Sequence, residues 1–287
     1  MKKILIQLDT DEHPSTFDAI VAHDAGVDVL LRYGSVEPDA VRGLVQSAFF
    51  TRAPKDLSNM AVWVGGSSVG AGEKVLEQVK KAFFGPFKVS VMLDSNGCNT
   101  TAATAVAKLA KEIDLQGRRV LIVGAGAVGL RAAAVLEQEG SDVTISGIPA
   151  DRFGENYRRA RGLSVAEERG FRTVEPGDDE ALARELDGAS VVLAAGPAGV
   201  QLLPDALWRG ADSVEVLADF NAAEPLGIEG TGANDEFEDY NGKKVLGALA
   251  IGGPKMKVHK ACLRRLFETN DVVLDIDGVY DVAKELG

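Results

Sequence analysis

The feature that most restricts how this chain can fold is a glycine-rich turn near its middle, Gly124-Ala-Gly-Ala-Val-Gly129. The turn follows the apolar run Arg119-Val-Leu-Ile-Val123 and opens a stretch rich in Ala that continues to about Glu139. An apolar strand, a turn of the form G-x-G-x-x-G and a helix, in that order, are typical of the first unit of a dinucleotide-binding domain. The pattern therefore predicts a strand, a tight turn and a helix over this segment.

Each glycine of the turn has its own expected role. Gly124 permits the tight turn, Gly126 lets the backbone approach a pyrophosphate, and Gly129 allows the helix to pack closely on the strand. The helix begins around Ala127 and Val128, where free N–H groups and the positive end of the helix dipole attract phosphates. A tight turn that binds nothing is the alternative, and the strand and helix on either side favour the dinucleotide site.

Apolar runs alternate with helical patterns on both sides of this turn. Examples are the runs Lys3–Leu8 and Ala61–Gly66 before it, and Ser190–Ala194 after it. This alternation predicts an α/β protein with mostly parallel sheets covered on both faces. We expect two domains, because a dinucleotide fold is complete near residue 250. A Rossmann-type NAD(P)-binding domain, with its leading connecting helix, occupies 99–254. A smaller α/β substrate domain is formed by 1–98 and completed by the C-terminal helices of 255–287.

Composition excludes several classes of function. The chain has 43 acidic and 31 basic residues and a formal net charge of −12, which argues against binding to nucleic acid or to an anionic membrane. No stretch approaches the roughly 18 apolar residues of a transmembrane helix. Two cysteines, Cys98 and Cys262, give no disulfide framework and favour a cytoplasmic location. The three histidines have no metal-ligand spacing, so we expect no metal site.

The segment Thr144-Ile-Ser-Gly-Ile148 bears on the choice between NAD and NADP. NAD enzymes usually place an acidic residue here to hold the ribose 2′-hydroxyl, and this segment has none. Ser146 can donate to a phosphate oxygen, and several arginines follow, of which Arg152 is the best placed partner for a 2′-phosphate. NADP is therefore the predicted cofactor. The alternative is that the arginines form a solvated helix face.

Two later turns are expected at the same edge of the sheet. Ala195 and Gly196 lie in a turn of small residues after one apolar run, and Asn221 follows the next run. Ligands of such sheets bind beyond the carboxyl ends of the strands, so these residues are candidates for contacts with the cofactor. Ordinary turn residues would have the same composition.

Three further segments carry more polar residues than a simple turn needs: Pro14–Asp18, Asp94–Thr101 and Gly252–His259. If the third segment begins a helix, Lys255 and His259 are four residues apart and share one face. Spacing alone favours a surface lysine and a packed histidine over a functional pair.

These segments, together with Phe83-Phe-Gly-Pro-Phe87 and Ile251-Gly-Gly-x-Lys-x-Lys-x-His259, resemble the NADP-dependent methylene-tetrahydromethanopterin dehydrogenases along essentially the whole chain. The resemblance implies an oxidoreductase of one-carbon metabolism with two domains and a tetrahydromethanopterin-type pterin bound between them. It also implies a homo-oligomer, with a trimer as the expected state. A methylene-tetrahydrofolate or dual-pterin dehydrogenase, and an NADP-binding sensor or scaffold without turnover, are the alternatives.

The resemblance also assigns site residues. It implies Phe17 as a ring that stacks on the pterin, Thr101 as a hydrogen-bonding group, and Lys255 and His259 as polar groups of the cleft. Asn99, in the same segment as Thr101, is a further candidate for substrate binding. Relatives tend to have Gly-Arg where this chain has Gly147-Ile148, which leaves use of NAD open.

The chemistry that the resemblance implies favours Asp18 as an electrostatic catalyst. Loss of hydride from the methylene carbon leaves a methenyl cation, and no substrate proton is removed. A carboxylate beside the growing positive charge stabilises it, whereas an ammonium group there opposes it. We therefore expect Asp18 and Lys255 to be the catalytic residues. Asp18 acts on the transition state, and Lys255 holds a pterin oxygen, balances the charge of Asp18 or orients the substrate. The alternative is that Asp18 serves only the start of its helix.

Overall fold

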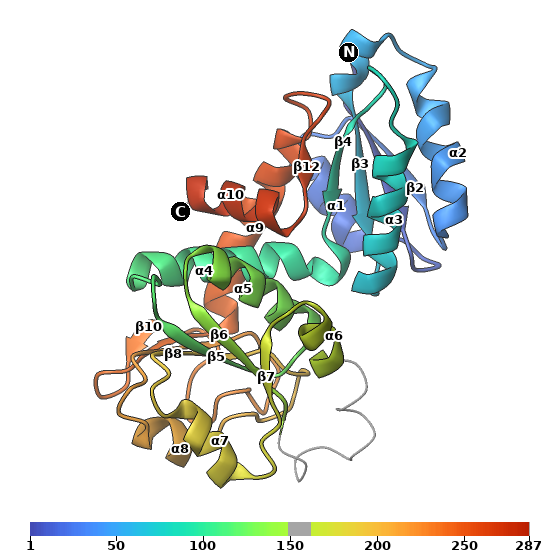
Figure 1. Ribbon diagram of the computed structural model, residues 1–287. Helices are drawn as coiled ribbons and strands as arrows, with labels where there is room; N and C mark the ends of the chain where they lie inside the picture. Colours follow the sequence, from blue (N-terminus) through green and yellow to red (C-terminus); the bar gives the residue numbers. More distant parts are fainter. Residues whose placement is uncertain (149–161, 287) are drawn as a thin grey trace. The chain divides into compact units, whose positions relative to one another are not determined.

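The computed structural model describes residues 1–148 and 162–286. The chain divides into two compact units, Met1–Thr100 with Lys255–Gly287, and Thr101–Pro254. Each unit is built on its own sheet with helices beside it (Figure 1). The predicted α/β class is therefore confirmed.

The first unit has a five-stranded sheet in which every pair of neighbouring strands is parallel. Across the sheet the strands are β2 (Val29–Tyr33), β1 (Ile4–Asp9), β3 (Met60–Gly65), β4 (Ser90–Leu93) and β12 (Val273–Leu274). Read in chain order this is 2-1-3-4-5, the flavodoxin-like arrangement, whose switch point lies between β1 and β3. The last strand comes from the C-terminal part of the chain.

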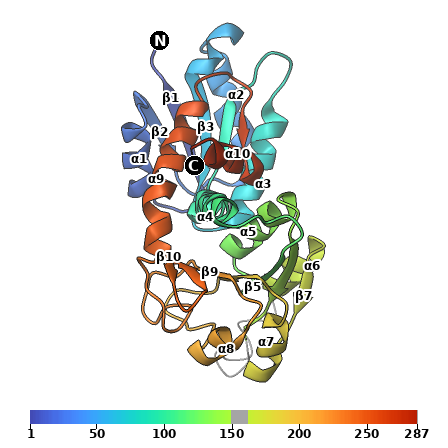
Figure 2. The ribbon, with the colours of Figure 1, turned by 90° about the vertical axis from the view of Figure 1, so that its left-hand side faces the viewer.

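Helices cover both faces of this sheet. They are α1 (Thr16–Asp24), α2 (Pro38–Phe49), α3 (Val69–Ala82), α10 (Ile276–Leu286) and part of α9 (Ala248–Arg265); two short 3-10 helices span Pro54–Asn59 and Ser95–Gly97. The α2 and α3 helices pack on the face that carries Ile6, Leu8 and Val62. Figure 2 shows α1 and α9 on the side opposite α3. Burial on both faces explains why these strands are apolar throughout.

The second unit has seven strands, parallel except for one edge pair. Across the sheet they are β10 (Glu236–Asp239), β11 (Lys244–Leu246), β9 (Val216–Asp219), β8 (Val191–Ala194), β5 (Arg119–Val123), β6 (Asp142–Ser146) and β7 (Arg172–Val174). From β7 to β11 the order is 3-2-1-4-5-6, that of a Rossmann fold, with the switch point between β5 and β8.

The helices of the second unit are α5 (Ala127–Gln138), α6 (Gly162–Glu168), α7 (Asp179–Leu186) and α8 (Asp205–Gly210); α4 (Cys98–Glu112) runs from the first unit into it. Its core includes Leu121, Val192 and Leu217 from the sheet and the fully buried Trp208 from α8. The Trp208 indole N–H donates to the Glu229 carbonyl at 3.0 Å, so this large side chain is buried without an unpaired donor.

The helix α9 begins earlier than the sequence suggests. The expected C-terminal helices lie within 255–287, whereas α9 begins at Ala248 and contains Pro254 in its interior. A proline inside a helix removes one backbone hydrogen bond, but it does not always end the helix.

We predict that Phe49 and its neighbour Phe50 differ sharply in their contributions to stability. Phe49 is fully buried, with its ring centroid 6.1 Å from those of Phe83 and Phe84, whereas Phe50 is 72% exposed. Phe49→Ala should lower the free energy of unfolding by about 3–5 kcal/mol through the cavity it leaves. Phe50→Ala should cost about 1 kcal/mol or less. Urea unfolding followed by circular dichroism measures both, and similar losses would contradict this packing.

Candidate functional site

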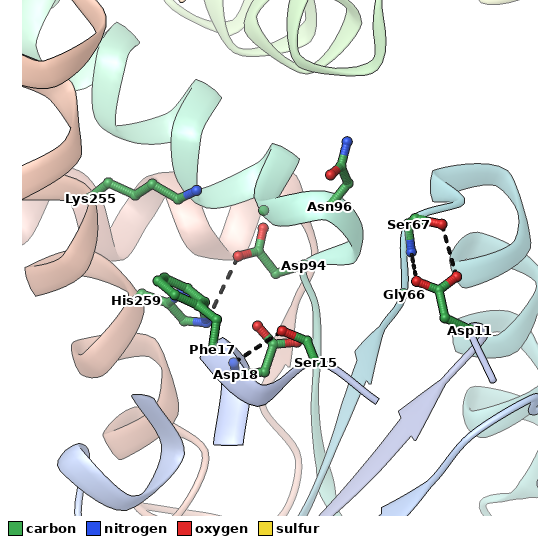
Figure 3. A pocket seen from close by; sticks show the side chains of 11 residues that line it. Asp11, Ser15, Phe17, Asp18, Gly66, Ser67, Asp94, Asn96, Lys255 and His259 are labelled. Carbon is green, nitrogen blue, oxygen red and sulfur yellow. Dashed lines mark hydrogen bonds and ion pairs between the residues drawn. The ribbon is translucent and has the colours of Figure 1, made fainter. Parts of the chain in front are cut away.

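A cavity of about 330 Å³ lies in the first unit where β1, β3 and β4 end (Figure 3). Its volume falls within the range of small-molecule sites. Ligands of open α/β sheets bind beyond the carboxyl ends of the strands at the switch point, and β1 and β3 flank that point here. The lining residues are Asp11, Ser15, Phe17, Asp18, Gly66, Ser67, Asp94, Asn96, Gly97, Lys255 and His259.

The start of α1 directs Asp18 toward this cavity. Ser15 caps the helix by accepting the Asp18 N–H at 3.2 Å. In a capping box the acidic residue would in turn accept the N–H of the capping serine. Here the Ser15 N–H donates instead to Asp9 Oδ2 at 3.3 Å, and Asp18 lines the cavity with its Oδ2 3.4 Å from the Gln7 amide nitrogen. The roles of Asp18 as an electrostatic catalyst or as a helix-start residue stay predictions.

Three carboxyl groups come together beneath the cavity. Asp9 is fully buried, Asp94 is 4% exposed and Asp18 is half-buried. Gly65, the last residue of β3, leaves room for two of them, because a Cβ there would lie 3.1 Å from Asp9 Oδ2 and 3.3 Å from Asp18 Oδ2. Burial, and then the charges of Asp94 and Asp9, raise the pKa of Asp18 to about 7, against the opposing effects of Ser15 and Lys255. Asp18 is thus about half ionised at neutral pH.

Asp94 ties the end of β4 to the start of α4 and lies beside His259. It accepts hydrogen bonds from the Thr100 N–H at 3.0 Å and the Thr100 hydroxyl at 2.7 Å. His259 Nε2 is 3.9 Å from Asp94 Oδ2, and the imidazole is 1% exposed. Burial lowers the pKa of His259 although Asp94 acts to raise it, so the ring is neutral at pH 7. Neither ring nitrogen has a hydrogen-bond partner among the described residues.

Phe17 and Lys255 complete the cavity wall. Phe17 is 53% exposed, and its ring centroid is 6.4 Å from that of His259. Lys255 and His259 extend from the same face of α9 into the cavity, as their spacing predicted (Figure 3). The Lys255 ammonium lies over Gly97, where a Cβ would come within 2.6 Å of Nζ. Among the described residues that line the cavity, Lys255 is the one permanent cation.

Two predicted substrate residues are not among those that line the cavity. Asn99 is buried, and its side-chain N–H donates to the Leu93 carbonyl at 2.7 Å, which holds the end of β4. Thr101 is half-buried on α4 and is the first residue of the second unit. Their roles in substrate binding stay predictions.

Sequence reasoning missed other cavity residues, including Asp11, Gly66 and Ser67. The Asp11 carboxylate accepts the Ser67 N–H at 2.9 Å and the Ser67 hydroxyl at 2.8 Å, which joins the loops after β1 and β3. Their position in the sequence could have identified these residues, because both loops follow apolar strands and such loops meet at one edge of a parallel sheet.

The predicted dinucleotide turn lies between β5 and α5, at the switch point of the second unit. Gly124 has φ +104°, and a Cβ there would lie 2.8 Å from the Gly196 nitrogen. A Cβ at Gly126 would lie 2.9 Å from the Ala195 carbonyl oxygen. A Cβ at Gly129 would likewise lie 2.9 Å from the Gly124 carbonyl oxygen. The predicted residues Gly124, Gly126, Ala195 and Gly196 are therefore brought together.

The turn fits the pyrophosphate of a dinucleotide. Gly126 caps α5 and has no side chain with which to bond its first N–H groups. Those groups, around Ala127 and Val128, have no partner within the helix and form a natural site for an anion.

Two of the other predicted cofactor residues, Ser146 and Asn221, already form hydrogen bonds within the protein. The Ser146 hydroxyl, at the end of β6, donates to the Gly147 carbonyl at 2.8 Å. Asn221 is bonded within its own loop, since its side chain donates to the Pro225 carbonyl and accepts the Ala223 N–H. Arg152 lies outside the described residues. Contacts of these three with a cofactor stay predictions.

Over the described ranges, 1–148 and 162–286, no three His, Cys, Asp or Glu side chains are arranged to hold a metal ion. No helix within these ranges is long and apolar enough to cross a membrane.

The fold and the two switch points define a class, that of two-unit α/β proteins in which one unit binds a dinucleotide. Residues 112–220 match the family model described as putative NAD(P)-binding. Residues 16–96 match the model for the N-terminal region of methylene-tetrahydromethanopterin dehydrogenase.

Two proteins of Methylorubrum extorquens are similar over their full lengths. The chain is 43% identical to one named bifunctional protein MdtA, with 99% of each chain covered. It is 31% identical, again with 99% of each covered, to the NAD(P)-dependent methylenetetrahydromethanopterin dehydrogenase. The chain therefore belongs to the methylene-tetrahydromethanopterin dehydrogenase family.

A solved structure supports the fold alone. Shikimate 5-dehydrogenase from Listeria monocytogenes aligns with a TM-score of 0.52 at 14% identity, covering 98% of this chain and 96% of that one.

We predict that Gly126→Ala weakens binding of NADP by about tenfold or more, because the new methyl group would meet the Ala195 carbonyl and the path of the pyrophosphate. Gly210→Ala is the matched control, since a Cβ there has nothing within 4 Å. Titration of each variant with NADP, followed by protein fluorescence, measures the affinity. An unchanged affinity in Gly126→Ala would remove the turn from the cofactor site.

Proposed function

We propose that this protein is an NAD(P)-dependent methylene-tetrahydromethanopterin dehydrogenase. It moves a hydride reversibly from N5,N10-methylene-tetrahydromethanopterin to NADP and leaves the methenyl cation. The observation that carries the proposal is the pairing of an exposed ring, Phe17, with a carboxyl group, Asp18, whose pKa is about 7 at the edge of an acidic cavity. Such a site can hold a flat substrate and stabilise a positive charge. Membership of the family supports the same reaction.

We assign the pterin to residues 1–98 with 255–287, and the cofactor to residues 99–254. Supporting this division, the cavity is lined by residues of the first unit and the glycine turn lies in the second.

The reaction balances without a proton. The hydride carries both electrons of the C–H bond, so positive charge grows over N5, the bridging carbon and N10. NADP, when bound, supplies the carbon that accepts the hydride. No general base is needed, and the useful contribution of the protein is charge stabilisation in the transition state. Asp18 in its ionised form provides this charge, and burial strengthens it by excluding water.

The other cavity residues position the substrate. Phe17 offers an aromatic face on which the pterin ring can stack. An ammonium group beside the forming cation would raise the barrier, so Lys255 instead holds an oxygen of the pterin. The neutral His259 adds no competing positive charge, and its ring supports the cavity wall beside Phe17. We retain Asn99 and Thr101 as further substrate contacts.

NADP is the preferred cofactor in this proposal, and NAD remains usable. Arg152 and Ser146 are the proposed contacts to the 2′-phosphate. Ala195 and Gly196 approach the nicotinamide half, and Asn221 borders it. The β6 strand ends in Ser146-Gly147-Ile148 without an acidic side chain to repel a phosphate.

We further propose a cytoplasmic homo-oligomer, with a trimer as the expected state. Cys98 and Cys262 are both free thiols, as is usual in the cytoplasm. Phe50 and Phe84 are 72% and 43% exposed and offer apolar surface that a second copy can cover. Sedimentation of the full chain measures the assembly.

The direct test is an assay of all four combinations of two pterins with two cofactors. We expect the fastest reduction with methylene-tetrahydromethanopterin and NADP. Faster turnover of methylene-tetrahydrofolate would instead make the protein a folate enzyme. Binding of NADP with no turnover of either pterin would refute the dehydrogenase and support a sensor or scaffold.

We predict that kcat rises with pH through about 7, because Asp18 stabilises the cation only when ionised. Below that pH the carboxyl group is protonated and neutral. Asp18→Asn keeps the shape of the side chain and should lower kcat by roughly 10²-fold and remove this rise. The measurement is a pH profile at saturating pterin and NADP. A kcat within about threefold of wild type would leave Asp18 with no electrostatic role.

A further inference from the structure

Gln7 is a buried polar side chain on β1 that the mechanism above does not use. It is fully buried, and its side-chain N–H group lies 3.3 Å from Asp9 Oδ2 and 3.4 Å from Asp18 Oδ2. Its oxygen accepts a hydrogen bond from Arg32 Nε at 3.1 Å. One amide therefore links an arginine to two carboxyl groups of the acidic cluster.

The orientation of this amide is determined by its partners. A guanidinium group only donates hydrogen bonds, so the Gln7 oxygen must face Arg32 and the N–H group must face the carboxylates. Arg32 is well placed for this, because it is the residue of β2 directly opposite Gln7 in the parallel pair.

Arg32 also fixes the start of α1. Its Nη2 donates to the carbonyl of Pro14 and, at 2.9 Å, to the carbonyl of Ser15. These two residues immediately precede the helix that carries Phe17 and Asp18. The same guanidinium therefore orients the amide and anchors the helix on which Asp18 stands.

We propose that Gln7 and Arg32 form a positioning pair that holds Asp18 in its ionised form and aligned with the cavity. This inference rests on the proposed function, in which ionised Asp18 stabilises the cation. Gln7 acts through Asp18 and is not itself a catalytic residue.

The charges around Asp18 show why a hydrogen-bond donor is needed to keep its carboxyl group ionised. Two carboxyl groups face it, and both raise its pKa, as does burial. Against these, a hydrogen bond with the side chain of Ser15 and the charge of Lys255 on α9 lower it, while His259 on the same helix is neutral. A donor aimed at the carboxylate favours the charged form. The groups facing Asp18 are Asp9 from β1, Asp94 from the end of β4, Ser15 from the start of α1, and Lys255 and His259 from α9, with Arg32 of β2 reaching it through Gln7.

The main test is Gln7→Met, which keeps the length of the side chain and removes the donor. We expect the pKa of Asp18 to rise above its wild-type value of about 7, because the amide no longer favours the charged carboxylate. The ionised fraction of Asp18 at pH 7 then falls, so kcat at pH 7 should fall severalfold and recover toward wild type at pH 9. A loss that is equal at both pH values would overturn the proposal.

Arg32→Met provides a second variant at an exposed position, in case Gln7→Met does not fold. It frees the amide to turn and releases the start of α1, so the same shift of the pH profile should appear together with a higher KM for the pterin. Arg42→Met is the matched control, because Arg42 is an exposed arginine on α2 that bonds to Gln46. It should change neither quantity.

A titration without substrate separates this inference from the proposed function. Carbon-13 NMR of labelled aspartate carboxyl groups, with Asp18→Asn to assign the signal, reports the midpoint of Asp18 directly. We expect the midpoint to be higher in Gln7→Met and Arg32→Met than in wild type and Arg42→Met. An unchanged midpoint in both variants would overturn the inference even in an active enzyme. Absence of dehydrogenase activity in the wild type would refute the proposed function and its link to Gln7.

Discussion

The structure depends on close approach of the backbone at the two switch points. At each of these points the connections that follow two neighbouring parallel strands run to opposite faces of the sheet. In the first unit Gly65, the last residue of β3, lies against Asp9, the last residue of β1, and a Cβ at the following Gly66 would lie 2.0 Å from Thr10 Oγ1. In the second unit a Cβ at Gly124 would lie 2.9 Å from the Ala195 carbonyl oxygen. Both candidate sites exist because glycine at these positions lets two loops meet and leaves polar groups facing outward.

The two switch points differ in the groups that they present: N–H groups in the second unit and carboxyl groups in the first. In the second unit the uncapped N-terminus of α5 presents N–H groups, which suit the phosphates of a dinucleotide. In the first unit the same kind of junction gathers carboxyl groups, and burial makes one of them, Asp18, titrate near neutral pH. Asp9 and Asp94 accept hydrogen bonds from backbone and hydroxyl donors, whereas Asp18 accepts one from the Gln7 amide and lines the cavity.

Local signals predicted the α/β class, the glycine turn and the shared face of Lys255 and His259, because each depends on spacing within a few residues. The α2 helix was missed although Val41, Val45 and Phe49 recur at helical spacing after Pro38. The two-residue strand β12 has no local signal, since only its pairing with β4 makes it a strand. The role of Gln7 also depends on tertiary structure, because Arg32, its partner 25 residues away, is reached through the register of β1 and β2.

The charge of the first site also affects the equilibrium of the proposed reaction. In that reaction the substrate is neutral at the reacting carbon and the product is a cation, so the proposed role of ionised Asp18 would extend from the transition state to the product. A permanently ionised carboxylate in this position would hold the cation tightly and slow its release. A pKa near 7 limits this effect, because a proton can occupy Asp18 when the cation leaves. Burial disfavours the ionised form of Asp18, and the hydrogen-bond donors around it favour that form. In the proposed reaction, the balance between these effects is a compromise between stabilising the cation and releasing it.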